Sequence, residues 1–205
     1  MQAEVLELLT ARKGHFLLES GHHGNLWLEL ERLCLEPTKL KPLIHALAEE
    51  ISSLRPEIIC GPLVEGAFIG LLVAAELDVQ FTYTERHAQP AVDGLFPASY
   101  RLPIPLLKQV QGKRIAIVND VVNAGSAVRG TFSHLKECGG TVVGIGAFLV
   151  LGDAASKFAE AENVALKTLA AMPNHLWIPS ECPLCDAGDR LEDVADFRRG
   201  LEAKR

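Results

Sequence analysis

The sequence predicts an α/β domain in which helices flank a parallel β-sheet, and three observations support this prediction. Apolar runs short enough for buried strands alternate along the chain with segments of helical spacing. One such run, residues 115–118, is mostly β-branched, which is typical of a strand covered on both faces of a parallel sheet. The chain has 205 residues, 48% of them hydrophobic, which is enough for one well-filled core.

The first part of the chain predicts a small unit followed by alternating helices and strands. Residues 5–9 form the apolar face of a short helix, and residues 15–18 and 26–30 suit a small antiparallel pair. Residues 38–54 carry apolar side chains at helical spacing, which predicts a helix with one buried stripe. Residues 58–60 and 79–83 are expected strands, and the strongly apolar residues 68–77 are expected to form the helix between them.

The second part continues the alternation after a long connection. Residues 86–112 contain four prolines and little periodicity, so we interpret them as a mobile active-site loop, the alternative being a surface meander without function. Residues 115–118 form a strand that Asn119 and Asp120 end, and residues 141–149 form another. We expect a single domain over 1–205, with a hood at 1–36, a core at 37–172 and a tail at 173–205.

Composition excludes several classes of partner. The net charge is −6 and there is no run of Lys or Arg, which argues against binding to nucleic acid or to an anionic membrane. No apolar stretch approaches the length of a membrane-spanning helix, and charges throughout residues 1–20 argue against a signal peptide. Five scattered cysteines indicate reduced thiols. We therefore expect a cytoplasmic protein that binds neither nucleic acid nor a membrane.

Residues 119–127 look like a strand that leads into a phosphate-binding helix start. Gly125 lets backbone N–H groups turn towards an anion, and Ser126 is suited to cap the helix that follows. The partial positive charge of a helix N-terminus favours phosphate, and the carboxylate of Asp120 is placed to accept hydrogen bonds from sugar hydroxyls. These features predict a phosphorylated sugar ligand, with an ordinary strand-to-helix turn as the alternative.

The stretch 113–130, KRIAIVNDVVNAGSAVRG, resembles the phosphoribosyl pyrophosphate signature of type I phosphoribosyltransferases. Residues 14–18 with Ser20-Gly21, residues 61–66, Glu85-Arg86 and residues 182–185 follow in the order seen in orotate phosphoribosyltransferases, so the resemblance covers nearly the whole chain. It implies the Rossmann-like fold of that family and Mg²⁺-dependent transfer of phosphoribose from phosphoribosyl pyrophosphate to a base, most simply orotate, in pyrimidine biosynthesis. It also implies a homodimer in which the mobile loop of one subunit covers the site of the other.

The resemblance assigns roles to particular residues. In the family, the loop matching residues 123–127 holds the ribose phosphate, the acid matching Asp120 contacts the ribose hydroxyls, and the loop matching residues 61–66 binds pyrophosphate. The ligand-binding residues expected here are Gly61, Pro62, Glu65, Gly66, Asn119, Asp120, Asn123, Ala124, Gly125, Ser126 and Ala127. The candidate catalytic residues are Asp120, Arg86 and His87.

Arg86 and His87 have alternatives of their own. The guanidinium of Arg86 is suited to bind phosphate oxygens with two hydrogen bonds, and the strand before it would aim it into the cleft, but a surface ion pair with Glu85 or Glu65 is the alternative. The imidazole of His87 is suited to donate a proton to a leaving phosphate oxygen, with a solvated loop histidine as the alternative.

Several positions depart from the family pattern. Glu65 stands where many relatives have lysine or glycine, and it must turn outward, pair with Arg86 or Arg101, or help to hold a metal ion. Asn119 replaces the first acid of the signature, Glu19 replaces a basic residue, Leu151 stands where the orotate enzymes have arginine, and the loop after Arg86 has no lysine before Lys108. Our hypothesis is that the fold and ribose-phosphate site persist while base specificity or turnover has changed. A non-catalytic binder that senses a nucleotide or phosphoribosyl pyrophosphate is the alternative.

Cys182 and Cys185, spaced C-x-x-C, are suited to ligate zinc. A tetrahedral site needs four ligands, and near this pair in sequence we find only His175 and Asp186. The sequence therefore favours a turn with buried thiols and no metal, with a metal shared across a dimer as a further alternative.

Overall fold

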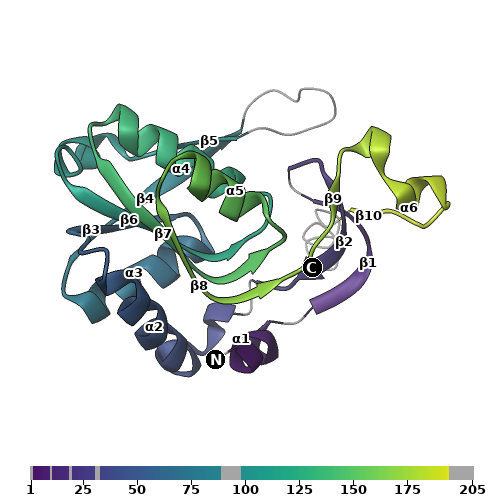
Figure 1. The fold of residues 1–205 in the computed structure, drawn as a ribbon, viewed down its shortest axis with the longest axis horizontal. Helices are drawn as coiled ribbons and strands as arrows, with labels where there is room; N and C mark the ends of the chain where they lie inside the picture. The colour runs from purple at the N-terminus through teal and green to yellow at the C-terminus, as the bar shows by residue number, and fades with distance from the viewer. Residues whose placement is uncertain (1, 10, 19, 31–32, 89–97, 194–205) are drawn as a thin grey trace, which may run out of the picture.

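The larger of the two β-sheets in the described part of the chain forms the centre of the fold, with helices on both of its faces (Figure 1). The computed structural model describes residues 2–9, 11–18, 20–30, 33–88 and 98–193. The central sheet has the order β5-β4-β3-β6-β7-β8, and its strands are β3 (Ile58–Pro62), β4 (Gln80–Ala88), β5 (Ala98–Arg101), β6 (Arg114–Val122), β7 (Thr141–Leu151) and β8 (Ala165–Met172). All neighbouring pairs are parallel except β4 and β5, so the predicted parallel sheet is confirmed.

Two apolar layers explain why the strands of this sheet read as continuous apolar runs. Helices α2 (Pro37–Ser52) and α3 (Glu65–Leu77) cover one face, and α4 (Ser126–Glu137) and α5 (Ala154–Ala161) cover the other. In β6, Ala116 and Val118 pack in the first layer while Ile115 and Ile117 pack in the second. The predicted stripe of α2 is buried, as expected for a helix that packs against the sheet through one face: Leu40, Leu43, Ile44, Leu47, Ala48 and Ile51.

Two predictions at the end of β6 are wrong. The strand does not end at Asn119, because β7 continues beside it and pairs with Asn119, Val121 and Val122. Ser126 does not cap α4, because Gly125 occupies the N-cap position with φ of 76° and Ser126 is the first helical residue. Glycine adopts a positive φ at the lowest steric cost, so Gly125 favours the start of the helix at this position.

The connection after Arg86 is more ordered than its composition predicts. Strand β4 extends to Ala88 and pairs antiparallel with β5, and a short 3-10 helix, η2 (Ile104–Gln109), follows. The interpretation of residues 86–112 as a mobile active-site loop stays a prediction, but their described part has regular structure, because pairing between strands gives an order that periodicity does not show. Residues 89–97 lie outside the described residues.

The second sheet combines the two ends of the described chain. After α1 (Gln2–Leu8), the hairpin of β1 (Ala11–Leu17) and β2 (His23–Leu28) confirms the predicted antiparallel pair. Two short strands from the tail, β9 (Leu176–Trp177) and β10 (Glu192–Asp193), flank this hairpin in the order β10-β1-β2-β9. The remaining short elements are η1 (Leu33–Leu35), η3 (Pro179–Glu181) and α6 (Pro183–Asp186). Sequence analysis does not anticipate that hood and tail share one sheet.

Candidate active site

A pocket of about 270 Å³ lies where the ends of β3 and β6 meet the hood hairpin. Both strands run in the same direction, so the segments that follow them meet at one edge of the sheet, the usual place for a ligand in such folds. Most of the predicted ligand-binding residues line it: Pro62, Glu65, Gly66, Asn119, Asp120, Asn123, Ala124, Gly125, Ser126 and Ala127. Side chains of the hood hairpin, among them Leu26, Trp27 and Leu28, also line the pocket.

The segment 123–127 lines this pocket and is the candidate for its anion-binding part. It leads into α4, whose first N–H groups have no partner within the helix and carry the positive end of the helix dipole. The side chain of Asn123 is held by the Nδ2 group of Asn174, which donates to its Oδ1 at 2.8 Å. The geometry is that of a phosphate cradle at a helix N-terminus.

Asn119 and Asp120 are both buried where β6 meets the pocket, but their side chains make different contacts. The Nδ2 group of Asn119 donates to the carbonyl oxygen of Val121 at 2.8 Å, and its Oδ1 fills the space beside Gly66. A carboxylate at position 119 would lose this donor and face the carbonyl oxygen instead, which explains locally why an amide fits there. Asp120 is 4% exposed and supplies a carboxylate to the pocket wall.

Glu65 lies in the first turn of α3 and lines the same pocket, so of the three alternatives the structure does not support the one in which it turns outward. Within the described part of the chain it forms no ion pair with Arg86 or Arg101. Burial, followed by the charges of Asp120 and Glu65, raises the pKa of the Cys34 thiol, so both carboxylates act on one region. The lining of the pocket therefore includes two carboxylates, those of Glu65 and Asp120, in addition to segment 123–127.

Arg129 is a cation that sequence analysis missed. It lines a second hollow of about 940 Å³ that shares Asn123, Ala124 and Leu151 with the pocket. Its Nη1 atom lies 3.0 Å from the position that a Cβ on Gly125 would take, and partial burial lowers its pKa. The pKa of His22 in the same hollow is also lowered, first by burial and then by the charge of Arg129. Arg129 follows Gly125 by four residues and so lies on the same side of the helix as Gly125, which is the feature of the sequence that could have indicated it.

Comparisons with known proteins agree with this geometry. The family model for the phosphoribosyl transferase domain matches residues 36–178. The chain belongs to the phosphoribosyl transferase domain family. It is therefore a glycosyltransferase of the phosphoribosyltransferase type, as the sequence predicts.

Relatives of this phosphoribosyltransferase match it over most of its length. Orotate phosphoribosyltransferase of Caldanaerobacter subterraneus subsp. tengcongensis is 27% identical over 185 residues, covering 90% of this chain and 89% of the relative. That of Thermotoga maritima is 28% identical and covers 98% and 100%. The crystal structure of orotate phosphoribosyltransferase from Aeropyrum pernix superposes with a TM-score of 0.64 at 19% identity, covering 84% of this chain and 94% of that one, which confirms the fold.

Three predicted residues of the phosphoribosyltransferase lie outside the pocket. Arg86 and His87 are exposed on β4, opposite Tyr100 and Ser99 of β5, so the expectation that the strand aims Arg86 into its own cleft is wrong. The cause is the extension of β4, which carries both side chains along the hairpin and beyond the edge where β3 ends. Gly61 lies against the backbone of Gly66, with which a Cβ at position 61 would collide.

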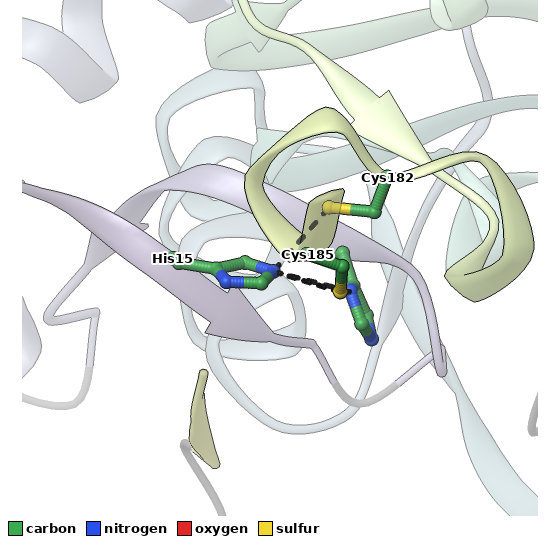
Figure 2. Close-up of side chains that lie close together, drawn as sticks. His15, Cys182 and Cys185 are labelled. Carbon is green, nitrogen blue, oxygen red and sulfur yellow. Dashed lines mark hydrogen bonds between the residues drawn. The ribbon is translucent and has the colours of Figure 1, made fainter. Parts of the chain in front are cut away.

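The two remaining predicted residues, Cys182 and Cys185, lie beside the hood hairpin of the phosphoribosyltransferase and do not line the pocket (Figure 2). Neither of the neighbours considered from sequence, His175 and Asp186, belongs to the cluster of ligand atoms around them. Glu19 lies outside the described residues. The described part of the enzyme contains no helix both long and apolar enough to cross a membrane.

Proposed function

We propose that this phosphoribosyltransferase transfers the phosphoribosyl group of phosphoribosyl pyrophosphate to orotate and so serves pyrimidine biosynthesis. The observation that carries the proposal is the placement of Asp120 and segment 123–127 on one pocket with the loop of Pro62 and Gly66. There, the carboxylate of Asp120 is suited to the ribose hydroxyls and the helix start at segment 123–127 is suited to the ribose phosphate. The curated relatives named above support orotate as the base.

The reaction is a displacement at the anomeric carbon of ribose. A ring nitrogen of the base forms a bond to that carbon as the bond to the pyrophosphate oxygen breaks, through a transition state with oxocarbenium character. In this chain the carboxylate of Asp120 accepts hydrogen bonds from the ribose hydroxyls and fixes the ring, while the N–H groups of segment 123–127 hold the phosphate. Leu26, Trp27 and Leu28 of the hood line the pocket with largely apolar surface, which would limit the access of water to a bound substrate.

The donors in the pocket fit a Mg²⁺ ion. Magnesium prefers oxygen ligands and is usually held by one or two carboxylates together with substrate phosphates, and Asp120 supplies a buried carboxylate beside the proposed phosphate positions. When bound, the ion would neutralise charge on the departing pyrophosphate. We propose that Asp120 is the residue that would hold this ion.

Arg129 is our candidate for the cation that binds the carboxylate of orotate in place of the arginine missing at Leu151. It lies in the hollow that shares Leu151 with the pocket, and within the described residues no carboxylate forms an ion pair with it. We expect Arg129→Met to raise KM for orotate by roughly 30-fold, the loss of about 2 kcal/mol of charge-assisted hydrogen bonding.

The split between the two KM values tests this role of Arg129. KM for phosphoribosyl pyrophosphate should change little, and Arg55→Met, at the opposite edge of the sheet before β3, should leave both values unchanged. A rise in KM for phosphoribosyl pyrophosphate alone would assign Arg129 to a phosphate instead.

The function is tested by measuring pyrophosphate release from phosphoribosyl pyrophosphate with Mg²⁺ and each of orotate, uracil, adenine, guanine and hypoxanthine. We expect turnover with orotate alone. Turnover with a different base would replace orotate in the proposal. Calorimetric binding of phosphoribosyl pyrophosphate with no turnover on any base would establish the non-catalytic binder.

We also propose a cytoplasmic homodimer in which the β4–β5 hairpin of one subunit reaches the pocket of the other. The exposure of Arg86 and His87 on that hairpin, away from the pocket of their own subunit, supports this arrangement. Light scattering that gives the mass of a single 22.2 kDa chain at micromolar concentration would contradict it.

A further inference from the structure

Four side chains from opposite ends of the chain gather beside the hood, apart from the active-site pocket. His15 belongs to β1 and His23 to β2, whereas Cys182 precedes α6 and Cys185 lies within it. One nitrogen or sulfur atom of each residue lies within 4.8 Å of the others. Figure 2 shows the imidazole of His15 directed at the two thiols. This is a set of two nitrogen and two sulfur ligands drawn from one chain.

The distances between these atoms match those between the ligands of a tetrahedral zinc ion. With Zn–N near 2.0–2.1 Å and Zn–S near 2.3 Å, tetrahedral geometry requires about 3.3 Å between two nitrogens and about 3.6 Å between nitrogen and sulfur. His15 Nε2 lies 3.2 Å from His23 Nδ1. The Cys182 Sγ atom lies 3.3 Å from His15 Nε2, and the Cys185 Sγ atom lies 3.8 Å from His15 Nε2 and 3.3 Å from His23 Nδ1.

The surroundings of His15 also suit a metal ligand. Its Nδ1 lies 3.0 Å from the carbonyl oxygen of Asp189, which can only accept a hydrogen bond, so Nδ1 carries the proton and Nε2 presents its lone pair to the cluster. A backbone carbonyl that fixes the tautomer in this way is the usual partner of a histidine bound to metal. Without a metal, the ring nitrogens and thiol sulfurs, which are acceptors or weak donors, would be buried together without strong hydrogen bonds, which is unfavourable.

Local geometry places the two thiols together independently of the histidines. The N–H of Cys185 donates to the carbonyl oxygen of Cys182 at 3.1 Å, and this turn brings the two side chains to one side. His15, His23 and Cys182 are buried, at 3%, 6% and 2% exposed, while Cys185 is exposed. Three buried ligands and one at the surface leave the cluster accessible to an entering ion.

We propose that His15, His23, Cys182 and Cys185 bind a structural zinc ion that clamps the tail to the hood. The sequence favours a metal-free turn because only two ligands are close in sequence; the fold supplies the other two. With four protein ligands the site has no open position for a substrate, so its role is to hold β1 and β2 in place beside the pocket that this hairpin lines. The proposal does not rest on the identity of the base.

The direct test is the metal content of the full chain, purified without chelator and without a histidine tag. We expect about one zinc per chain by elemental analysis. Replacement by Co²⁺ should give the thiolate-to-cobalt charge-transfer and strong visible bands of a tetrahedral site, and added Zn²⁺ should abolish them. Removal of the metal by a chelator should lower Tm by roughly 5–10 °C, because a ligand that binds only the folded state stabilises it.

Two variants and a matched control isolate the site. Cys185→Ser removes the exposed ligand and should keep the fold while losing most of the zinc, and the Cys182→Ser/Cys185→Ser variant should retain under a tenth of an equivalent. Cys138→Ser is the control, because the Cys138 Sγ atom also lies near an imidazole, 3.6 Å from His134 Nε2, yet the pair has no place in the four-residue cluster. The control should keep its zinc and its response to chelator.

Either of two results would overturn the proposal. One is wild-type protein that contains under a tenth of an equivalent of zinc and takes up neither Zn²⁺ nor Co²⁺ when these are added under reducing conditions. The other is zinc content that is unchanged in the Cys182→Ser/Cys185→Ser variant. Both measurements are independent of catalysis, so failure of the orotate assay leaves the zinc result unaffected.

Discussion

Asp120→Asn should lower kcat/KM for phosphoribosyl transfer by roughly 100-fold or more, because the variant loses the charge that strengthens two hydrogen bonds to ribose hydroxyls. Hydrogen bonds to a charged group are worth about 1.5–3 kcal/mol each, and a total loss near 3 kcal/mol corresponds to this factor. Asparagine has nearly the same shape and keeps one acceptor, so the buried position stays filled. The measurement is steady-state release of pyrophosphate with Mg²⁺, compared with the wild-type enzyme.

The control for Asp120→Asn is Asp78→Asn, the same change at an exposed residue after α3. Asp78 adopts a left-handed conformation with φ of 54°, which asparagine tolerates well, so Tm and turnover should both be unchanged. Calorimetry should show weaker binding of phosphoribosyl pyrophosphate to Asp120→Asn at an unchanged Tm. Full activity in Asp120→Asn would exclude the proposed contact with ribose.

The parts of the fold that the sequence predicts are those that depend on local apolar pattern. Helix α2 and strands β3, β6 and β7 follow from spacing because each buries a stripe or a run against the sheet. The end of β6 does not follow from spacing, because polar Asn119 and Asp120 remain in the strand only through pairing with β7. The β4–β5 hairpin is also set by pairing between strands, which composition alone does not show.

The same distinction holds for the functional residues. Segment 119–127 is continuous in sequence, and the whole segment lines one pocket. The position of the Arg86 side chain depends on where β4 ends, and the apolar pattern of this nine-residue strand does not determine that end. The histidines of the proposed zinc site could not be predicted from the sequence, because 167 positions separate His15 from Cys182 and only the pairing of tail and hood brings them together.

Glu65→Gln should tighten the binding of pyrophosphate, measured by calorimetry without Mg²⁺, by roughly 10- to 100-fold. Glu65 lines the pocket in the loop that matches the pyrophosphate loop of the family, and no arginine of that region neutralises it in the described structure. Two like charges at about 4 Å repel by about 4 kcal/mol at an effective dielectric constant of 20. Glu65 is only partly buried, so solvent screening reduces the expected gain to about 1.4–2.8 kcal/mol.

Binding measured with and without Mg²⁺ distinguishes this repulsion from a role of Glu65 as a metal ligand. If Glu65 only repels the anion, Mg²⁺ should strengthen pyrophosphate binding more in the wild-type enzyme than in Glu65→Gln, because the ion masks a charge that the variant already lacks. A metal ligand behaves oppositely, since its removal would weaken binding only when Mg²⁺ is present. Glu76→Gln, an exposed glutamate near the end of α3, is the matched control and should show wild-type affinity under both conditions. Weaker binding of pyrophosphate by Glu65→Gln in Mg²⁺ would therefore assign Glu65 as a ligand of the ion. The glutamate that departs from the family pattern would then be the second carboxylate of the metal site, together with Asp120.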